Sequence, residues 1–162
     1  MMNENETWRD LIENGSVIMF WKNSLMERNI EQLKQEGFDV YDFDCTNWDE
    51  KKIHKDLAET LNFTDYYGEN LDAFNDCLSD VETENKGFVL IFRNYDVFSH
   101  KHSELAYDLL DIIQTQSWRF LIKGTVLMSF VQSNDINLTF PPIGRMRADW
   151  NIEEWSDDSR GL

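Results

Sequence analysis

The chain has 162 residues, of which 41% are hydrophobic and 14% aromatic, so it is long enough for one domain with a substantial core and is not disordered. Its 31 acidic residues outnumber 15 basic ones, and the formal net charge of −16 argues against direct binding of nucleic acid or of an anionic membrane. A protein partner of this chain is therefore expected to be basic.

The first part of the chain predicts two strands with a helix between them. Residues 16–21 form a short apolar run typical of a buried strand, and Ser24 with Glu27 has capping-box spacing for a helix that ends near Gly37. Residues 38–44 alternate in part between apolar and polar side chains, as a strand does. The start of the chain is thus expected to add a βα unit in front of the remaining fold.

A second helix is predicted between residues 46 and 61. Thr46 and Asn47 are suited to cap its start, because their side-chain oxygens accept hydrogen bonds from free backbone N–H groups. Its apolar residues recur at helical spacing, at Ile53, Leu57, Ala58 and Leu61. This spacing gives the helix one face for the core.

Residues 66–80 join a pair of tyrosines to a helix with carboxylates along one side. At about 100° per residue, the apolar side holds Leu71, Phe74, Cys77 and Leu78, and the acidic side holds Glu69, Asp72, Asp76 and Asp80. Asn70 is the predicted N-cap, and Asp72 then lies in the first turn, where the helix dipole favours a negative charge. The pattern fits an anion-presenting binding surface, but an acidic helix face that is simply solvated is the commoner meaning of such spacing.

The next part of the chain adds two strands and a long helix. Gly87 precedes an uninterrupted apolar run, Phe88–Phe92, which is typical of a strand covered on both faces. Ser103 is predicted to cap a helix that carries Leu105, Leu109, Ile112 and Ile113. Gly124 precedes a last strand at residues 125–131. Alternating strands and helices favour an α/β fold with a small, mainly parallel sheet, because parallel strands need crossovers that helices supply.

The C-terminal segment departs from this pattern after Pro141 and Pro142. A slightly basic stretch follows, with Arg145, Arg147 and Arg160. Trp150 and Trp155 predict that this tail packs back on the domain. No linker composition separates the tail, so residues 1–162 are expected to form a single domain.

Cys45 and Cys77 are too few for a disulfide framework, and neither lies in a Cys-x-x-Cys or Cys/His cluster that would bind zinc. Reduced thiols fit a cytoplasmic protein. Residues 1–14 lack a basic stretch followed by an apolar one, and no window approaches 18 consecutive apolar residues. Neither an export signal nor a membrane span is expected.

The sequence gives weaker support to an enzymatic site than to a binding surface. Asp72 and Asp76, four residues apart, could hold Mg²⁺ or act as acid and base, but paired carboxylates in hydrolases come from different elements that face a cleft. The seven glycines are widely separated, which excludes a phosphate-binding loop, and His100 and His102 fall in a predicted exposed loop. We therefore expect no catalysis, no cofactor and no metal site.

The segment Tyr66-Tyr67-Gly68-Glu69-Asn70-Leu71-Asp72-Ala73, followed by Asp76-Cys77-Leu78, closely resembles the central motif of the barstar family of intracellular ribonuclease inhibitors. The resemblance covers residues 38–93 and continues to Val131. It implies a barstar-like α/β core at residues 38–131, flanked by extensions at residues 1–36 and 133–162.

The resemblance also implies that this turn and helix enter the active site of a ribonuclease and block RNA. Tyr66 would stack near the catalytic histidine of the ribonuclease, Asp72 would pair with a substrate-binding arginine, and Asp76 would meet the basic cluster that holds RNA phosphate. The other residues implied in the contact are Tyr67, Gly68, Asn70, Leu71, Asn75 and Asp80. Carboxylates suit this role because they accept charge-assisted hydrogen bonds from arginine, as phosphate oxygens do.

Three positions depart from the family pattern. Asn75 stands where the family has a tryptophan, Asp80 occupies a family glycine position, and Gln114-Thr115 lies about where the family supplies another carboxylate. These departures favour a related or different ribonuclease, or another basic nuclease toxin, as the partner. The expected function is a non-catalytic, cytoplasmic immunity protein that inhibits a nuclease of the same bacterium. The alternative is an adaptor or regulatory protein that uses its acidic face to bind another basic protein.

Overall fold

The computed structural model describes residues 6–63, 67–144 and 148–155. The helices and strands follow in the order α1 (Thr7–Leu11), β1 (Val17–Phe20), α2 (Asn23–Gln35), β2 (Phe38–Asp44), α3 (Lys52–Thr60), α4 (Leu71–Ser79), β3 (Gly87–Arg93), α5 (Tyr95–Lys101), α6 (Ser103–Ile122), β4 (Val126–Gln132), β5 (Asp149–Trp150) and α7 (Ile152–Trp155). The five strands of the described residues form one sheet, in the order β2-β3-β4-β1-β5, and each neighbouring pair is parallel.

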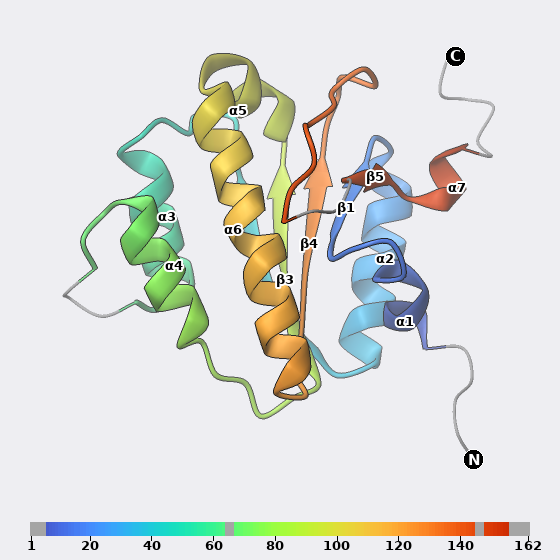
Figure 1. Cartoon of the computed structure of the whole chain (residues 1–162). Coiled ribbons are helices and arrows are strands. Elements are labelled where there is room, and N and C mark those ends of the chain that lie inside the picture. The colour runs from blue at the N-terminus through green and yellow to red at the C-terminus, as the bar shows by residue number, and fades with distance from the viewer. Residues whose placement is uncertain (1–5, 64–66, 145–147, 156–162) are drawn as a thin grey trace.

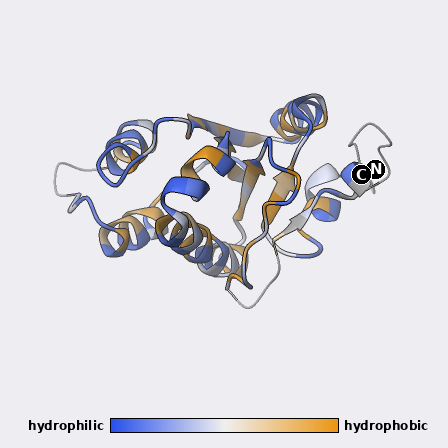
Figure 2. Ribbon diagram, turned by 90° about the horizontal axis from the view of Figure 1, so that it is seen from above, coloured by the Kyte–Doolittle hydropathy of each residue, from blue (hydrophilic) through white to orange (hydrophobic). Residues whose placement is uncertain are grey.

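Helices cover both faces of this sheet (Figure 1). On one face, α3, α4, α5 and α6 bury apolar side chains against strand residues such as Leu90 and Val131. On the other face, α2 packs Met26 and Leu33 against Val89, with α1 beside it. Figure 2 shows the apolar residues along the strands and the polar residues along the outer sides of the helices. The predicted α/β class is confirmed, and so is the N-terminal βα unit, which consists of β1 and α2.

The strand β3 is covered on both faces, as its uninterrupted apolar sequence predicts. Phe88 faces the cluster under α6, its neighbour Val89 faces the cluster under α2, and both are fully buried. A Cβ atom on Gly87 would lie 1.9 Å from the backbone oxygen of Val126 in β4. Only glycine therefore allows β3 and β4 to start side by side at this point.

Three predicted helix caps are wrong, although the helices are present. α2 begins at Asn23 and α6 at Ser103, and neither has a side-chain cap, so Ser24 and Ser103 lie inside their helices. α3 begins at Lys52, whose backbone N–H donates to Oδ1 of Asp49 at 2.7 Å. The residues predicted to cap α3, Thr46 and Asn47, lie in an earlier turn. Thr, Asn and Asp are all good caps, so packing of the apolar face decides which of them is used.

The predicted exposed loop around His100 is also wrong, because residues 95–101 form α5. His100 lies in the last turn of this helix, and its Nε2 is 3.1 Å from a carboxylate oxygen of Asp135. His102 is the single residue that separates α5 from α6. The helix α1 was likewise not predicted.

The C-terminal tail returns to the sheet, as Trp150 predicts. β5 pairs with β1, and Trp150 is half-buried against the core. In α7, the buried Glu154 accepts hydrogen bonds from the backbone N–H groups of Trp21 and Lys22, at 3.3 and 2.9 Å. The tail thus supplies acceptors for the backbone just ahead of α2. The side chain of Trp155 and the arginines of the predicted basic stretch lie outside the described residues: Arg145, Arg147 and Arg160.

Candidate protein-binding site

The turn before α4 is shaped by the side chain of Asn70. Its Oδ1 accepts the backbone N–H of Ala73 at 2.8 Å, which confirms the predicted N-cap, and its Nδ2 donates to the carbonyl of Gly68 at 3.3 Å. Glu69, between them, has a φ of 52°, in the left-handed region that side chains rarely adopt. Both ends of the Asn70 amide are therefore used within the chain, and they hold the turn in one conformation.

Gly68 is exposed at the outer side of this turn. A Cβ atom there would meet the Cβ of Ala73 at 3.4 Å and Nδ2 of Asn70 at 3.5 Å, which are ordinary contacts. The surrounding chain therefore leaves room for a side chain at this position. The glycine leaves the backbone of the turn open to close approach from outside.

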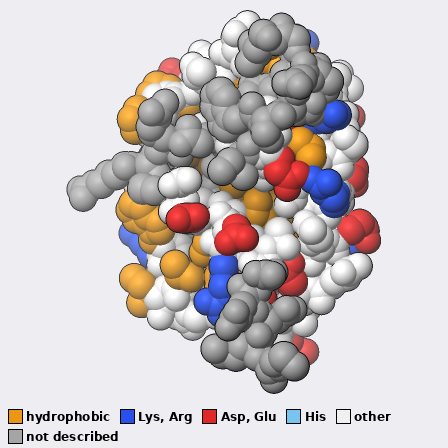
Figure 3. Space-filling view, turned by 90° about the vertical axis from the view of Figure 1, so that its right-hand side faces the viewer, with side chains coloured by type: hydrophobic (Ala, Val, Ile, Leu, Met, Phe, Trp, Pro, Cys, Tyr) orange, Lys and Arg blue, Asp and Glu red, His pale blue; other side chains and the backbone are white. Residues whose placement is uncertain are grey.

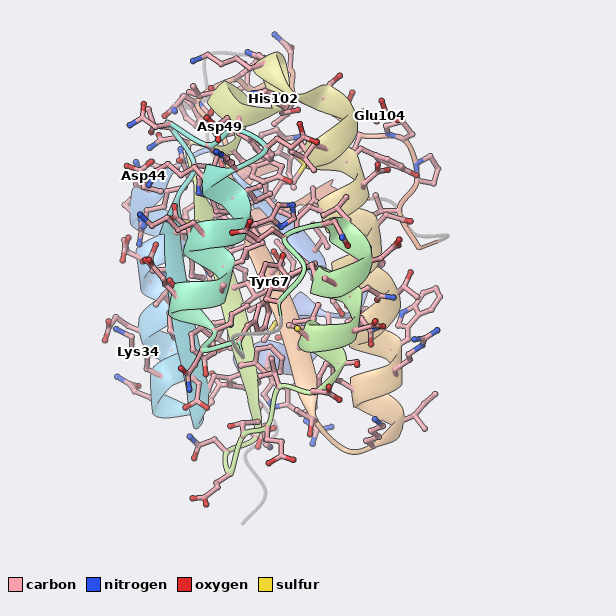
Figure 4. All side chains as sticks on the ribbon, turned by 90° about the vertical axis from the view of Figure 1, so that its left-hand side faces the viewer. Lys34, Asp44, Asp49, Tyr67, His102 and Glu104 are labelled. Atoms are coloured by element: carbon pink, nitrogen blue, oxygen red, sulfur yellow. The ribbon has the colours of Figure 1, made fainter. Side chains whose placement is uncertain are left out.

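Tyr67 points into the molecule between α3 and α4 (Figure 4). Its hydroxyl shares a hydrogen bond of 2.5 Å with Nδ1 of His54, and its ring lies 5.1 Å from the ring of Phe63. Tyr67 is half-buried, and this burial raises the pKa of its hydroxyl above the ordinary value. Its polar end is thus used within the chain. Tyr66, the other predicted contact residue, lies outside the described residues.

His54, to which no role was assigned from the sequence, is only 3% exposed beneath this turn. Burial lowers the pKa of its imidazole, and the negative charges of Glu69 and Glu50 oppose the shift only in part. The buried ring is therefore neutral near pH 7. From its place in α3, the ring holds Tyr67 in position, and Tyr67 in turn holds the turn before α4.

This histidine predicts that stability declines in mild acid. Because the pKa of His54 is lower in the folded chain, the unfolded chain takes up the proton first as the pH falls below about 6.5. The free energy of unfolding should then decrease from about pH 6.5 downward, and less so in His54→Gln. Urea unfolding between about pH 5 and 8 measures this dependence. The exposed His100→Gln is the control, and equal pH dependence in all three proteins would exclude His54 as the cause.

The helix α4 has an exposed acidic side and a buried apolar side. Phe74 and Leu78 are fully buried, and Leu71 and Cys77 are half-buried. The exposed carboxylates are Asp72, Asp76 and Asp80. None of the three has an ion-pair partner among the described residues. The predicted division of this helix is confirmed, and its negative charges face solvent.

The three positions that depart from the family pattern have a clear structural setting. Asn75 is half-buried on the side of α4 that faces α6, and its Oδ1 accepts a hydrogen bond from Nε2 of Gln116 at 2.6 Å. Asp80 follows the last residue of α4 with a φ of −95°, a conformation that does not require glycine. Gln114 is buried, and its side-chain oxygen accepts the backbone N–H of Ser16 at 2.9 Å. Asn75 therefore joins two helices, while Asp80 adds charge at the exposed end of α4.

The acidic surface also includes carboxylates at the start of α6, which the sequence analysis missed. Asp108 and Glu104 line a concavity of about 530 Å³ together with Glu69 and Asn70 from the turn before α4. Burial, followed by repulsion from Glu104 and Asp111, raises the pKa of the Asp108 carboxyl. Figure 4 shows Glu104 and His102 at the end of the molecule where α5 meets α6. These acidic residues of α6 are far from α4 in the sequence, and the fold brings them close to it.

Within residues 6–63, 67–144 and 148–155, no group of three His, Cys, Asp or Glu side chains is placed to hold a metal ion. In the same part of the chain, no helix has the length and apolar character needed to cross a membrane.

Two comparisons relate this structure to known proteins. Residues 38–131 match the family model described as "Barstar (barnase inhibitor)". A Bacillus subtilis (strain 168) protein named "Putative ribonuclease inhibitor YrdF" is 37% identical over 62 residues, which are 38% of this chain and 66% of that protein. The family match contains α4 and the turn before it, and it leaves out β1, α2 and β5.

Proposed function

The chain belongs to the barstar family, and from this we propose that it is an intracellular inhibitor that binds a ribonuclease and blocks its active site. The contact surface consists of the turn at residues 66–70 and the acidic side of α4. The observation that carries the proposal is the exposure of Asp72 and Asp76, without ion-pair partners among the described residues, on a helix anchored by two fully buried side chains.

The fixed geometry of this surface suits it to replace RNA in a basic cleft. Asp72 and Asp76 are four residues apart, which places them about 6 Å apart along the helix axis. Their carboxylates are available to arginine side chains that otherwise hold phosphate. Because the turn and helix are held by Asn70, Tyr67 and Phe74, little conformational entropy is lost on binding.

The departures at Asn75 and Asp80 bear on which nuclease is bound. Gln116 engages the Asn75 side chain, so the proposed contact at this position is limited to the atoms of Asn75 that stay exposed. Asp80 extends the row of carboxylates beyond Asp76 by one more helical turn. We place the partner among related or different ribonucleases and other basic nuclease toxins, and the inhibitor in the cytoplasm as an immunity protein. β1 and β5 extend the sheet of the core, which supports a single domain.

Inhibition of RNA cleavage tests this function. The chain should be titrated into barnase and into each nuclease encoded beside its gene, with a fluorogenic RNA as substrate. Cleavage by the cognate nuclease is expected to fall linearly to zero at equimolar inhibitor, because the active site is occluded. The Asp72→Asn/Asp76→Asn variant should inhibit poorly, since these exposed residues are not needed for folding.

Two controls accompany this assay. The chain alone, with and without Mg²⁺, should leave the RNA intact. If no tested nuclease is inhibited at large excess while the chain still captures a different basic protein through α4, the adaptor function replaces the proposed one.

Association with the nuclease is expected to be accelerated by charge. Nine acidic residues and no basic ones lie between Lys55 and Lys86, so the field around α4 is strongly negative. The association rate constant, measured by stopped flow, should fall at least about tenfold between low and high salt, because the Debye length is only about 8 Å at physiological ionic strength. Glu31→Gln, in α2 on the other face of the sheet, is the control and should keep the same salt dependence. A rate constant independent of salt would exclude steering.

A further inference from the structure

The large apolar side chains that are exposed, among the described residues, gather at one end of α6. They are Trp118, Leu121 and Ile122, here called the apolar patch, and Ile122 is 88% exposed. Figure 3 shows apolar side chains together at the lower left, on the side of the molecule where α6 lies, with a basic side chain beside them. Single exposed apolar side chains are normal in a monomer, whereas a group of them in one place indicates a contact surface.

The charges of α6 are separated along its length. Glu104 and Asp108 lie in its first half, whereas Arg119 lies in its last turn and Lys123 directly after it. None of these four side chains forms an ion pair within residues 6–63, 67–144 and 148–155. The helix dipole favours this order of charges, but it does not account for the exposed apolar side chains. The helix therefore presents one acidic half and one half that is both apolar and basic.

Both halves lie on the side of α6 that faces away from the sheet. At about 100° per residue, five positions fall within about 60° of one another, opposite buried residues such as Leu109 and Ile113. These positions are Glu104, Asp108, Thr115, Arg119 and Ile122. Figure 1 shows α6 along the front of the molecule, with no labelled helix or strand in front of it. A helix of 20 residues is about 30 Å long, so this side offers a long, narrow surface to a partner.

A second copy of α6 in antiparallel orientation complements these charges. In a two-fold symmetric contact, a residue that meets another across the interface is met by its copy in return. Asp108 and Arg119 are equally far from the point between residues 113 and 114, and so are Glu104 and Lys123. A two-fold axis through this point therefore places Arg119 of each protomer opposite Asp108 of its partner, and Lys123 opposite Glu104. Ion pairs of this kind set the relative orientation of two packed helices.

The same register brings apolar side chains together. Ile122 lies opposite Leu105 of the other protomer, and Thr115 lies opposite Ile112, because these pairs are also equally far from the axis. Leu105, Thr115 and Ile112 are half-buried in the single chain, so each still has surface to offer. Trp118 flanks the contact and can cover part of it. One register thus accounts for the apolar patch and for both kinds of ion pair.

We propose that two copies of this chain associate through α6, paired with α6 of the second copy in antiparallel orientation. The net charge of −16 opposes contact between two chains elsewhere on their surfaces, which confines association to the region where basic side chains are available. A single pair of helices buries less than the roughly 800 Å² per partner of a standard interface, so the dimer is weak and reversible. The proposal goes beyond ribonuclease inhibition, and it does not depend on it.

Sedimentation velocity of the full chain at physiological salt, from about 1 to about 500 µM, tests the proposal. The average mass should rise from that of one chain towards that of two. Ile122→Asp should raise the dissociation constant at least about tenfold, because it places a charge without a partner in the contact. Gln32→Asp, exposed in α2 on the other face of the sheet, is the control and should leave it unchanged. A chain that is monomeric at every concentration would assign the apolar patch to a different partner and overturn the proposal.

Charge reversal tests the register. Arg119→Glu/Lys123→Glu and Glu104→Lys/Asp108→Lys should each lose self-association, because like charges then face one another across the axis. A mixture of the two variants should form a one-to-one complex at least as tight as the unmodified dimer, since every acidic side chain again meets a basic one. Circular dichroism shows whether each variant is folded, and Glu104→Lys alone serves if the half-buried Asp108 does not tolerate lysine. Unchanged self-association of Arg119→Glu/Lys123→Glu would show that the antiparallel register is wrong.

A matched control separates this register from attraction by net charge. Asp10→Lys/Glu13→Lys makes the same change in charge at two exposed positions on the other face of the sheet. Its complex with Arg119→Glu/Lys123→Glu should be at least about tenfold weaker than that formed by Glu104→Lys/Asp108→Lys. Equal affinity of the two mixtures would indicate a response to net charge alone and reject the proposed contact.

Discussion

Replacement of Asp76 by alanine is expected to weaken binding of the cognate ribonuclease by at least about 2 kcal/mol, or roughly thirtyfold. Asp76 lies in the middle of the exposed side of α4, beyond the first turn, and forms no ion pair with a described residue. Its charge therefore has no local structural role. In a complex it would be desolvated opposite basic groups, which would be left unpaired in the variant.

The matched control for this experiment is Glu84→Ala. Glu84 is also exposed and acidic, but it lies beyond α4 in the segment before β3. Both variants should unfold within about 0.5 kcal/mol of the unmodified chain, because exposed substitutions rarely matter more than this. Calorimetric binding and thermal melts on both variants measure the two quantities. Unchanged affinity in Asp76→Ala, with the nuclease still inhibited, would show that the contact surface lies elsewhere on the same fold.

The order of the strands shows where sequence reasoning about the fold stops. The apolar run that becomes β3 and the alternation of strands with helices predict a parallel α/β sheet, because burial on both faces requires such sequences. The position of β1, between β4 and the short β5, was not predictable in this way. It depends on pairing between residues that are more than 100 positions apart, such as Val17 with Ser129.

Local sequence patterns also predict only part of the candidate binding site. Local sequence alone predicts the acidic side of α4, from helical periodicity, and its Asn70 cap, from the preference of Asn for the position before a helix. The hydrogen bonds of Tyr67 with His54 and of Asn75 with Gln116 link α4 or its turn to other helices. No local pattern distinguishes such a residue from one that is free to contact a partner. Only the tertiary structure shows that part of the motif serves the fold.

Replacement of Phe74 by alanine should lower the free energy of unfolding by about 3–5 kcal/mol, because Phe74 anchors α4 in the core. Phe74 is fully buried in the cluster between the sheet and the helices α3 to α6, so its removal leaves a cavity there. Leu121→Ala is the control, since this apolar side chain of α6 is 47% exposed and its loss should matter by less than about 1 kcal/mol. Urea unfolding gives both values.

Nuclease binding measured on the same variant separates the role of α4 in folding from its role in binding. Asp72 and Asp76 are unchanged in Phe74→Ala, so its folded fraction should retain most of the affinity for the nuclease once the unfolded fraction is taken into account. Loss of affinity should therefore follow loss of structure as temperature rises, whereas Asp76→Ala should bind weakly at every temperature while remaining folded. If Phe74→Ala is destabilised by less than about 1 kcal/mol, the helix is held mainly by its other contacts, such as Leu78 and the Asn75–Gln116 hydrogen bond.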